Sequence, residues 1–219
     1  MPELHDGLNN APRERRGIKT DRIFRILLNN PQGNLTKYRI SVLAGAEQIQ
    51  VSLLLRQLES KGLVRVTKVR DYNGVVMEWS KREVKLPSQR FMLKSIMEVL
   101  GHVSMKYALT TYQAEALVNG YLFPTRTDLY IRLSDFDEWH STLVKSGAMV
   151  GGGNVTLKPY DDGVFYNSFH ANEGYSIVSI PQLIVDLVRE GGVATQAAEM
   201  LIEKNEGKAI KKKYSKRIP

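Results

Sequence analysis

The stretch from Glu47 to Gly62 reads EQIQVSLLLRQLESKG. Its apolar residues at 51, 54, 55 and 58 recur at the spacing of one face of a helix. Glycine commonly follows the last residue of a helix, so Gly62 is expected to end this one. The spacing therefore predicts a helix from about Glu47 to Lys61 with one buried stripe and an opposite polar face.

Two further helices are expected before this one. The first begins at Thr20 or Asp21, both of which are good N-cap residues, and ends where Pro31 blocks its continuation. The second runs over residues 35–44, and Gly45 permits a sharp turn into the third helix. The sequence thus predicts three helices in close succession.

Two β-rich runs, 63–69 and 75–79, follow the third helix. Asn73-Gly74 stands between them, and Asn-Gly is the strongest short signal for a hairpin. Three helices followed by a hairpin predict a winged helix-turn-helix over residues 20–86. The phrase LESKGLV at 58–64 also resembles the helix-to-wing junction of winged-helix regulators.

The basic charge is concentrated at the two ends of the chain. The net charge is +8; residues 1–80 contribute +5, residues 81–202 contribute −2 and residues 203–219 contribute +5. Such a distribution favours a polyanionic partner over a charge that only keeps the protein soluble. Residues 1–19 are expected to form a basic arm through Arg13, Arg15, Arg16 and Lys19, and 205–219 to form a basic tail.

The winged helix presents polar and basic side chains that are candidates for contact with double-stranded DNA. On the third helix, glutamine can pair with adenine and arginine with guanine in the major groove, and basic residues elsewhere can contact phosphates. The candidate contacts are Lys37, Tyr38, Arg39, Gln48, Gln50, Ser52, Arg56, Gln57, Lys68, Arg70, Tyr72 and Asn73. Two alternatives stay open: the same residues are a solvated face, or they belong to a module that binds protein or RNA.

The rest of the chain predicts a mixed α/β domain at 106–204, joined to the first domain by a linker helix within 87–105. The overall class is therefore α+β. The expected strands are 107–109, 128–133, 155–158 and 175–179, and the expected helices are 111–119, 135–145, 181–189 and 195–203.

Four segments of this second part carry a resemblance to a known family. They are YALTTYQA at 107–114, DLYI at 128–131, IPQLIVDL at 180–187 and AAEML at 197–201. In this order they resemble the AbiEi-type antitoxins of type IV toxin–antitoxin systems. The resemblance implies a nucleotidyltransferase-like second domain and a repressor of its own operon, binding its operator as a possible homodimer. It also implies an antitoxin that counters a nucleotidyltransferase-like toxin.

The residues that a nucleotidyltransferase needs are only partly present. Such an enzyme uses a Gly-Ser pair on a turn and two carboxylates one residue apart on a strand to hold metal ions. At the matching positions the chain has Thr110-Thr111, Asp128 and Tyr130. We therefore expect no catalysis, catalytic residue or cofactor, with a divergent nucleotidyltransferase as the alternative.

No metal site or membrane segment is expected. The four histidines are widely spaced and there is no cysteine, so neither a histidine cluster nor a thiolate site is indicated. The first sixteen residues are polar, and no apolar run approaches the roughly 20 residues that cross a bilayer. The sequence thus predicts a cytoplasmic protein that does not bind membranes.

Overall fold

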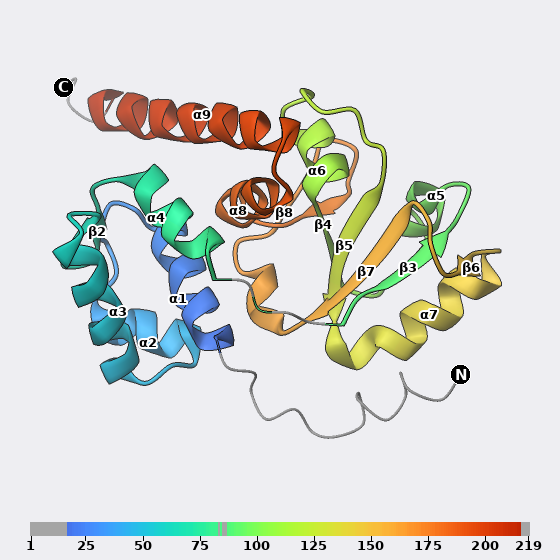
Figure 1. Ribbon diagram of the computed structural model, residues 1–219, viewed down its shortest axis with the longest axis horizontal. Coiled ribbons are helices and arrows are strands. Elements are labelled where there is room, and N and C mark those ends of the chain that lie inside the picture. The colour runs from blue at the N-terminus through green and yellow to red at the C-terminus, as the bar shows by residue number, and fades with distance from the viewer. Residues whose placement is uncertain (1–16, 83, 85–86, 216–219) are drawn as a thin grey trace.

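The structure is a computed structural model that describes residues 17–82, 84 and 87–215, with side chains described up to 205. A group of helices lies beside a mixed β-sheet (Figure 1), and the expectation of a mixed α and β composition is confirmed. We refer to residues 17–82 as the helical unit and to residues 87–205 as the sheet unit. Their buried apolar side chains form one continuous cluster, so the two units share a core.

The three predicted helices of the helical unit are present as α1 (Ile18–Asn29), α2 (Lys37–Ala44) and α3 (Gln48–Ser60). The hydroxyl of Thr36 caps α2 by accepting from the backbone N–H of Arg39 at 3.1 Å. The predicted apolar stripe of α3 is buried as expected. However, α1 begins at Ile18, so the expected N-cap at Thr20 or Asp21 is wrong, and the Asp21 carboxylate lies buried inside the helix.

The predicted hairpin is much shorter than expected. Strands β1 (Val64–Arg65) and β2 (Lys68–Val69) pair antiparallel, but the predicted strand at 75–79 is wrong because these residues lie in helix α4 (Tyr72–Ser80). Asp71 caps this helix, its carboxylate accepting from the N–H of Gly74 at 2.8 Å. A Cβ at Gly74 would lie 2.4 Å from the Leu63 side chain, so glycine serves close packing here and not a hairpin turn.

The sheet unit is built on seven strands in the order β6-β3-β7-β5-β4-β9-β8, with β5 parallel to β7 and β4 parallel to β9. The predicted strands correspond to β4, β5, β7 and β9, and the predicted helices to α6, α7, α8 and α9. The strands are β3 (Gln89–Met92), β4 (Tyr107–Thr110), β5 (Thr127–Arg132), β6 (Met149–Val150), β7 (Val155–Tyr160), β8 (Phe169–His170) and β9 (Ser176–Ile177). The helices are α5 (Ile96–Leu100), α6 (Thr111–Val118), α7 (Phe136–Lys145), α8 (Ile180–Glu190) and α9 (Val193–Ser215), with short 3-10 turns at Leu133–Asp135 and Asp162–Phe165.

The expected linker helix within 87–105 is wrong. Strand β3 occupies its first half and joins the sheet between β6 and β7, and only the five residues of α5 are helical. Phe91 is fully buried, and its ring meets the edge of the His140 ring at 5.6 Å. This segment is a strand because it pairs with β7, about sixty residues away in the sequence, where Phe91 lies opposite Val155.

The two faces of the sheet differ in polarity. Trp139 and Leu143 of α7 are fully buried, and Trp139 meets the ring of Tyr107 on β4 edge to face. Neighbouring residues on a strand point to opposite faces, so Thr110, Asp128 and Tyr130 face the other side. That side carries α6 and α8 (Figure 1), and it holds most of the polar contacts described below.

Helix α9 is longer than the sequence indicated. Its backbone runs as one helix from Val193 to Ser215, so the segment predicted as a tail at 205–219 is helical as far as residue 215. In Figure 1 it crosses α8 and extends toward the side of the molecule where α4 lies. No helix in the described ranges is long and apolar enough to cross a membrane.

The loop before β7 gives a test of the sheet. A Cβ at Gly153 would lie 2.1 Å from the backbone oxygen of Phe91, whereas one at Gly152 would meet nothing within 4 Å. We expect Gly153→Ala to lower the free energy of unfolding by about 1–3 kcal/mol, since backbone must move to make room. Gly152→Ala is the matched control and is expected to change it by less than about 0.5 kcal/mol. Equal urea midpoints for the two variants would contradict the β3–β7 pairing described here.

Candidate functional site

Helix α3 exposes the face opposite its buried stripe. Gln48 and Arg56 are exposed and Ser52 is half-buried, so these three candidate DNA contacts lie on the surface. The centre of the face, however, is formed by Ile49 and Leu53, which are 58% and 56% exposed. Sequence reasoning passed over these two residues, although their spacing of one helical turn opposite the buried stripe could have revealed them.

Two glutamines of α3 already hold partners within the helical unit. The side-chain oxygen of Gln50 accepts from the backbone N–H of Glu47 at 3.3 Å and forms a capping box at the start of α3. The side-chain oxygen of Gln57 accepts from the guanidinium of Arg82 at 3.4 Å. Bidentate pairing with adenine needs the oxygen and the NH₂ group together, so Gln50 would have to release the cap to read a base.

The candidates on α2 lie at its first turn, next to α3. Tyr38 is 65% exposed, Arg39 is exposed and Lys37 is half-buried. The N-terminus of a helix attracts anions, because its first backbone N–H groups lack partners within the helix. The basic side chains therefore lie at the end of α2 where the helix dipole is positive, and one N–H of this turn is already capped by Thr36.

The candidate DNA contacts that follow α3 in the sequence lie partly on the hairpin and partly on α4. Lys68 is exposed on β2, and Arg70 is exposed just after it. Asn73 is exposed on α4, whereas Tyr72 is only 5% exposed because it packs in the core, so its side chain does not lie on the surface as the predicted DNA contact would need.

Of the predicted N-terminal arm at 1–19, only residues 17–19 lie within the described part of the chain. Arg13, Arg15 and Arg16 lie outside the described residues, and Lys19 belongs to α1.

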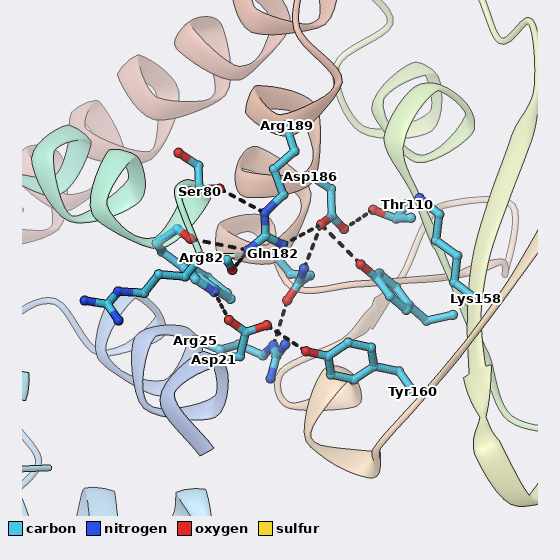
Figure 2. A network of polar contacts seen from close by, with 12 residues as sticks. Asp21, Arg25, Ser80, Arg82, Thr110, Lys158, Tyr160, Gln182, Asp186 and Arg189 are labelled. Carbon is cyan, nitrogen blue, oxygen red and sulfur yellow. Dashed lines mark hydrogen bonds and ion pairs between the residues drawn. The ribbon is translucent and has the colours of Figure 1, made fainter. Parts of the chain in front are cut away.

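A network of buried polar contacts connects the helical unit to α8 and the sheet (Figure 2). On α1, the Asp21 carboxylate accepts from the Trp79 indole N–H at 2.8 Å and from the Tyr160 hydroxyl at 2.6 Å. Arg25, also on α1, donates to the side-chain oxygen of Gln182 on α8 at 2.8 Å. Four segments far apart in the sequence, α1, α4, β7 and α8, therefore meet at one buried cluster.

Asp186 of α8 is the second carboxylate of this network. It accepts from the hydroxyls of Thr110 at 2.6 Å and Tyr130 at 3.2 Å and from the NH₂ group of Gln182 at 2.9 Å. Arg189, one turn later, lies 3.7 Å from Asp186. These contacts fix α8 on the polar face of the sheet.

Arg189 also binds the end of α4. Its guanidinium donates to the backbone oxygens of Trp79 at 3.3 Å, Ser80 at 3.4 Å and Arg82 at 2.6 Å. A cation at a helix C-terminus interacts favourably with carbonyl groups that have no partner inside the helix. Arg189 therefore holds the C-terminal end of α4 against α8 (Figure 2).

Burial controls the protonation of this network. It raises the pKa of Asp21 above its usual range, although hydrogen bonds and the nearby arginines act in the opposite direction. Burial, reinforced by Asp186, also raises the pKa of Tyr130 well above its ordinary value, and burial with Asp21 does the same for Tyr160. Both phenols therefore stay protonated and donate to the carboxylates.

The carboxylate at the position where a nucleotidyltransferase would hold metal is surrounded by cations. Asp128 is 1% exposed and accepts from Thr111 at 2.8 Å, while Arg126 and Lys158 lie 3.0 Å and 3.5 Å from it. Burial raises its pKa, but Lys158, hydrogen bonds and Arg126 outweigh this effect and lower it overall. Tyr130 stands two residues away, so no second carboxylate is available on that strand. The described residues contain no group of three histidines or carboxylates that could hold a metal ion.

A cavity of about 400 Å³ lies beside this network, between the helical unit and the sheet. Both carboxylates of the network, Asp21 and Asp186, line it, but their oxygens already accept hydrogen bonds from the protein. The cavity thus adjoins two carboxylates that are hydrogen-bonded by the protein itself.

The raised pKa of Asp21 predicts how its replacement depends on pH. Asp21→Asn keeps an acceptor for Trp79 and removes the buried ionisable group. The folded state holds the Asp21 proton more tightly than the unfolded chain, so its contribution to stability falls as pH rises from about 4 through the raised pKa. We expect the variant to gain stability relative to wild type in urea titrations as the pH rises above about 4. Tyr160→Phe removes a hydrogen bond that lowers the pKa of Asp21, so it should extend the loss to higher pH in a chain that keeps Asp21. A stability difference between Asp21→Asn and wild type that is constant with pH would contradict the assignment.

Comparisons of this chain with protein-family models, with curated proteins and with solved structures found no match. The resemblance drawn from the four sequence segments therefore remains an expectation. Function is to be inferred from the residues and contacts of the chain itself.

Proposed function

We propose that the protein is a sequence-specific regulator of transcription that binds double-stranded DNA through α3. The observation that carries the proposal is the exposed face of α3, flanked by the exposed basic residues Arg39 and Lys68 on neighbouring elements. Helix α2, the three residues 45–47 and α3 follow one another as in a helix-turn-helix, and the β1–β2 hairpin serves as a short wing.

The charge of the two units supports this assignment. Residues 17–82 contain twelve Lys or Arg and five Asp or Glu, a net charge of +7. Residues 87–205 contain nine Lys or Arg and thirteen Asp or Glu, a net charge of −4. Phosphate contacts dominate the affinity of proteins for DNA, so the helical unit is the part that attracts it and the sheet unit is not.

The proposal gives the basic residues separate tasks. Lys37 and Arg39 lie at the start of α2 and bind backbone phosphates, as do Lys68 and Arg70 at the hairpin. Arg56, exposed on α3, reaches into the major groove and pairs with guanine. The first set supplies affinity and Arg56 contributes to sequence choice.

The sheet unit takes the antitoxin role that the family resemblance implies, and we infer that it does so by binding a nucleotidyltransferase-like toxin. Asp128 bears on the alternative, since Arg126 and Lys158 lie beside it where the resemblance would place metal ions. Catalysis is thus the less supported alternative for this unit.

DNA binding is tested by fluorescence anisotropy on the duplex upstream of the protein's own gene and on a scrambled duplex, over a salt series. We expect preferential binding to the upstream duplex, and we expect Arg56→Ala to weaken it by about tenfold or more through loss of a base contact. The salt slope should change by no more than about one unit, because the phosphate contacts remain.

Arg90→Ala is the matched control, since Arg90 is exposed on β3 in the sheet unit, away from α3. It should leave binding unchanged. Equal affinity for both duplexes in wild type, or tighter binding to an RNA competitor, would overturn the assignment to an operator.

The antitoxin role is tested by co-expression with the product of the adjacent gene. We expect growth inhibition by that product to be relieved by wild type and equally by Arg56→Ala, because neutralisation uses the sheet unit. Failure of wild type to relieve inhibition, or to co-purify with the toxin, would remove the antitoxin role and leave DNA binding intact.

A further inference from the structure

The centre of the exposed face of α3 is apolar. Ile49 and Leu53 are 58% and 56% exposed and lie one helical turn apart, so their side chains are neighbours on the helix surface. Val42 and Tyr38 on α2 are also exposed large apolar side chains, at 49% and 65%. The remaining face of α3 is packed in the core, so this exposure is not a consequence of a loosely packed helix.

The surroundings of this apolar strip are basic. Between residues 37 and 57 the charged residues are Lys37, Arg39 and Arg56, with Glu47 as the single acid. The hairpin beside α3 adds Arg65 and Lys68, both exposed. A partner for this surface must therefore combine negative charge at its rim with apolar groups at its centre.

The major groove of DNA has this combination, because phosphates line its edges and each thymine presents a C5-methyl group inside it. A second copy of the chain does not, since a symmetric dimer through this face would bring two basic rims together. A neutral or acidic protein partner lacks an observation in its favour and is treated as an outcome of the test.

We propose that Ile49 and Leu53 recognise thymine methyl groups, so that the operator carries A·T pairs where the middle of α3 meets the groove. This inference rests on the proposed function. It also accounts for the side chain of Gln50, whose oxygen is committed to the cap of α3 and is not free for adenine. Sequence choice then comes from methyl contacts at the centre of α3 and from Arg56 near its end.

The expected size of the effect follows from the area involved. Burying one methyl-sized group contributes about fourfold in affinity, so loss of two methyl contacts should weaken binding by roughly tenfold or more. Two protomers on one operator would double the number of contacts.

The experiment replaces thymine by deoxyuridine in the upstream duplex, which removes only the methyl group and keeps base pairing. Footprinting first defines the protected region, and every thymine in it is replaced. Wild type and the double variant Ile49→Ala/Leu53→Ala are titrated by anisotropy on both duplexes and on a scrambled duplex. Val144→Ala is the matched control, because Val144 is an exposed apolar residue on α7 in the sheet unit.

We expect wild type and Val144→Ala to lose roughly tenfold on the deoxyuridine duplex, and the double variant to bind both duplexes equally and weakly. If the methyl groups contact Ile49 and Leu53 directly, removing them weakens binding by wild type but not by the double variant. A general change in DNA stiffness would weaken binding by both. Circular dichroism checks that the double variant is folded, which we expect because both residues lie on the surface.

Three results would overturn the inference, and they are distinguishable. Absence of preference for the upstream duplex by wild type ends the proposed function and this inference with it. Preference for the upstream duplex with equal losses for wild type and double variant on deoxyuridine DNA leaves the function and removes the methyl contacts. A double variant that changes the sedimentation of the free protein, or loses co-purification with the adjacent gene's product, while binding DNA normally assigns the strip to protein contacts.

Discussion

The placement of α8 on the polar face of the sheet is the constraint on which the rest of the structure depends. Asp186 can be buried there because two hydroxyls and an amide donate to it, since an unpaired carboxylate would be expelled or protonated. Three residues later, Arg189 reaches the other way and binds three backbone oxygens at the end of α4. One helix thus connects the sheet to the helical unit through hydrogen bonds whose geometry is specific, where apolar packing alone would allow the units to slide. Asp21 and Arg25 make the same connection from α1.

Several of the ionisable residues on this face of the sheet are paired with one another. Asp128 lies beside Arg126 and Lys158, and Arg126 also pairs with Glu190 at 2.5 Å. One oxygen of Asp128 is nevertheless buried without a hydrogen-bond partner among the described residues. The contacts of this network fix the orientation of the helical unit on the sheet unit. With the helical unit held by α1, α4 and α8, the remaining face of α3 is left on the outside of the molecule (Figure 1).

Helices and buried strands with a local apolar pattern were predictable from the sequence. Elements that form by pairing with a distant segment of the chain were not. The stripe of α3 and the strands β4, β5 and β7 follow local patterns of apolar residues, and these agree with the structure. The prediction of a hairpin at Asn73-Gly74 was wrong because a glycine can be needed for two different reasons. Gly74 is needed because the Leu63 side chain leaves no room for a Cβ, and the sequence does not distinguish this from a turn. Asp71 three residues before Gly74, with valines and Trp79 at helical spacing after it, was the signal for α4. Strand β3 offered no such signal, because its pairing with β7 joins segments about sixty residues apart.

The candidate site shows the same limit at the level of side chains. The exposure of Arg56 and Lys68 could be predicted from the amphipathic pattern of the sequence. The hydrogen bond from the Glu47 backbone N–H to Gln50 could not, because a capping box depends on the backbone geometry before the helix. Tyr72 was misplaced as a direct result of the hairpin error. Ile49 and Leu53 went unnoticed because apolar residues in a helix suggest a core, and only the full helical projection puts them opposite the buried stripe. An apolar pair retained at the centre of a basic, exposed helix face must be explained by what contacts it, since it adds nothing to the core. Under the proposed function, the base edges of the major groove are the surface whose chemistry matches both the pair and its rim.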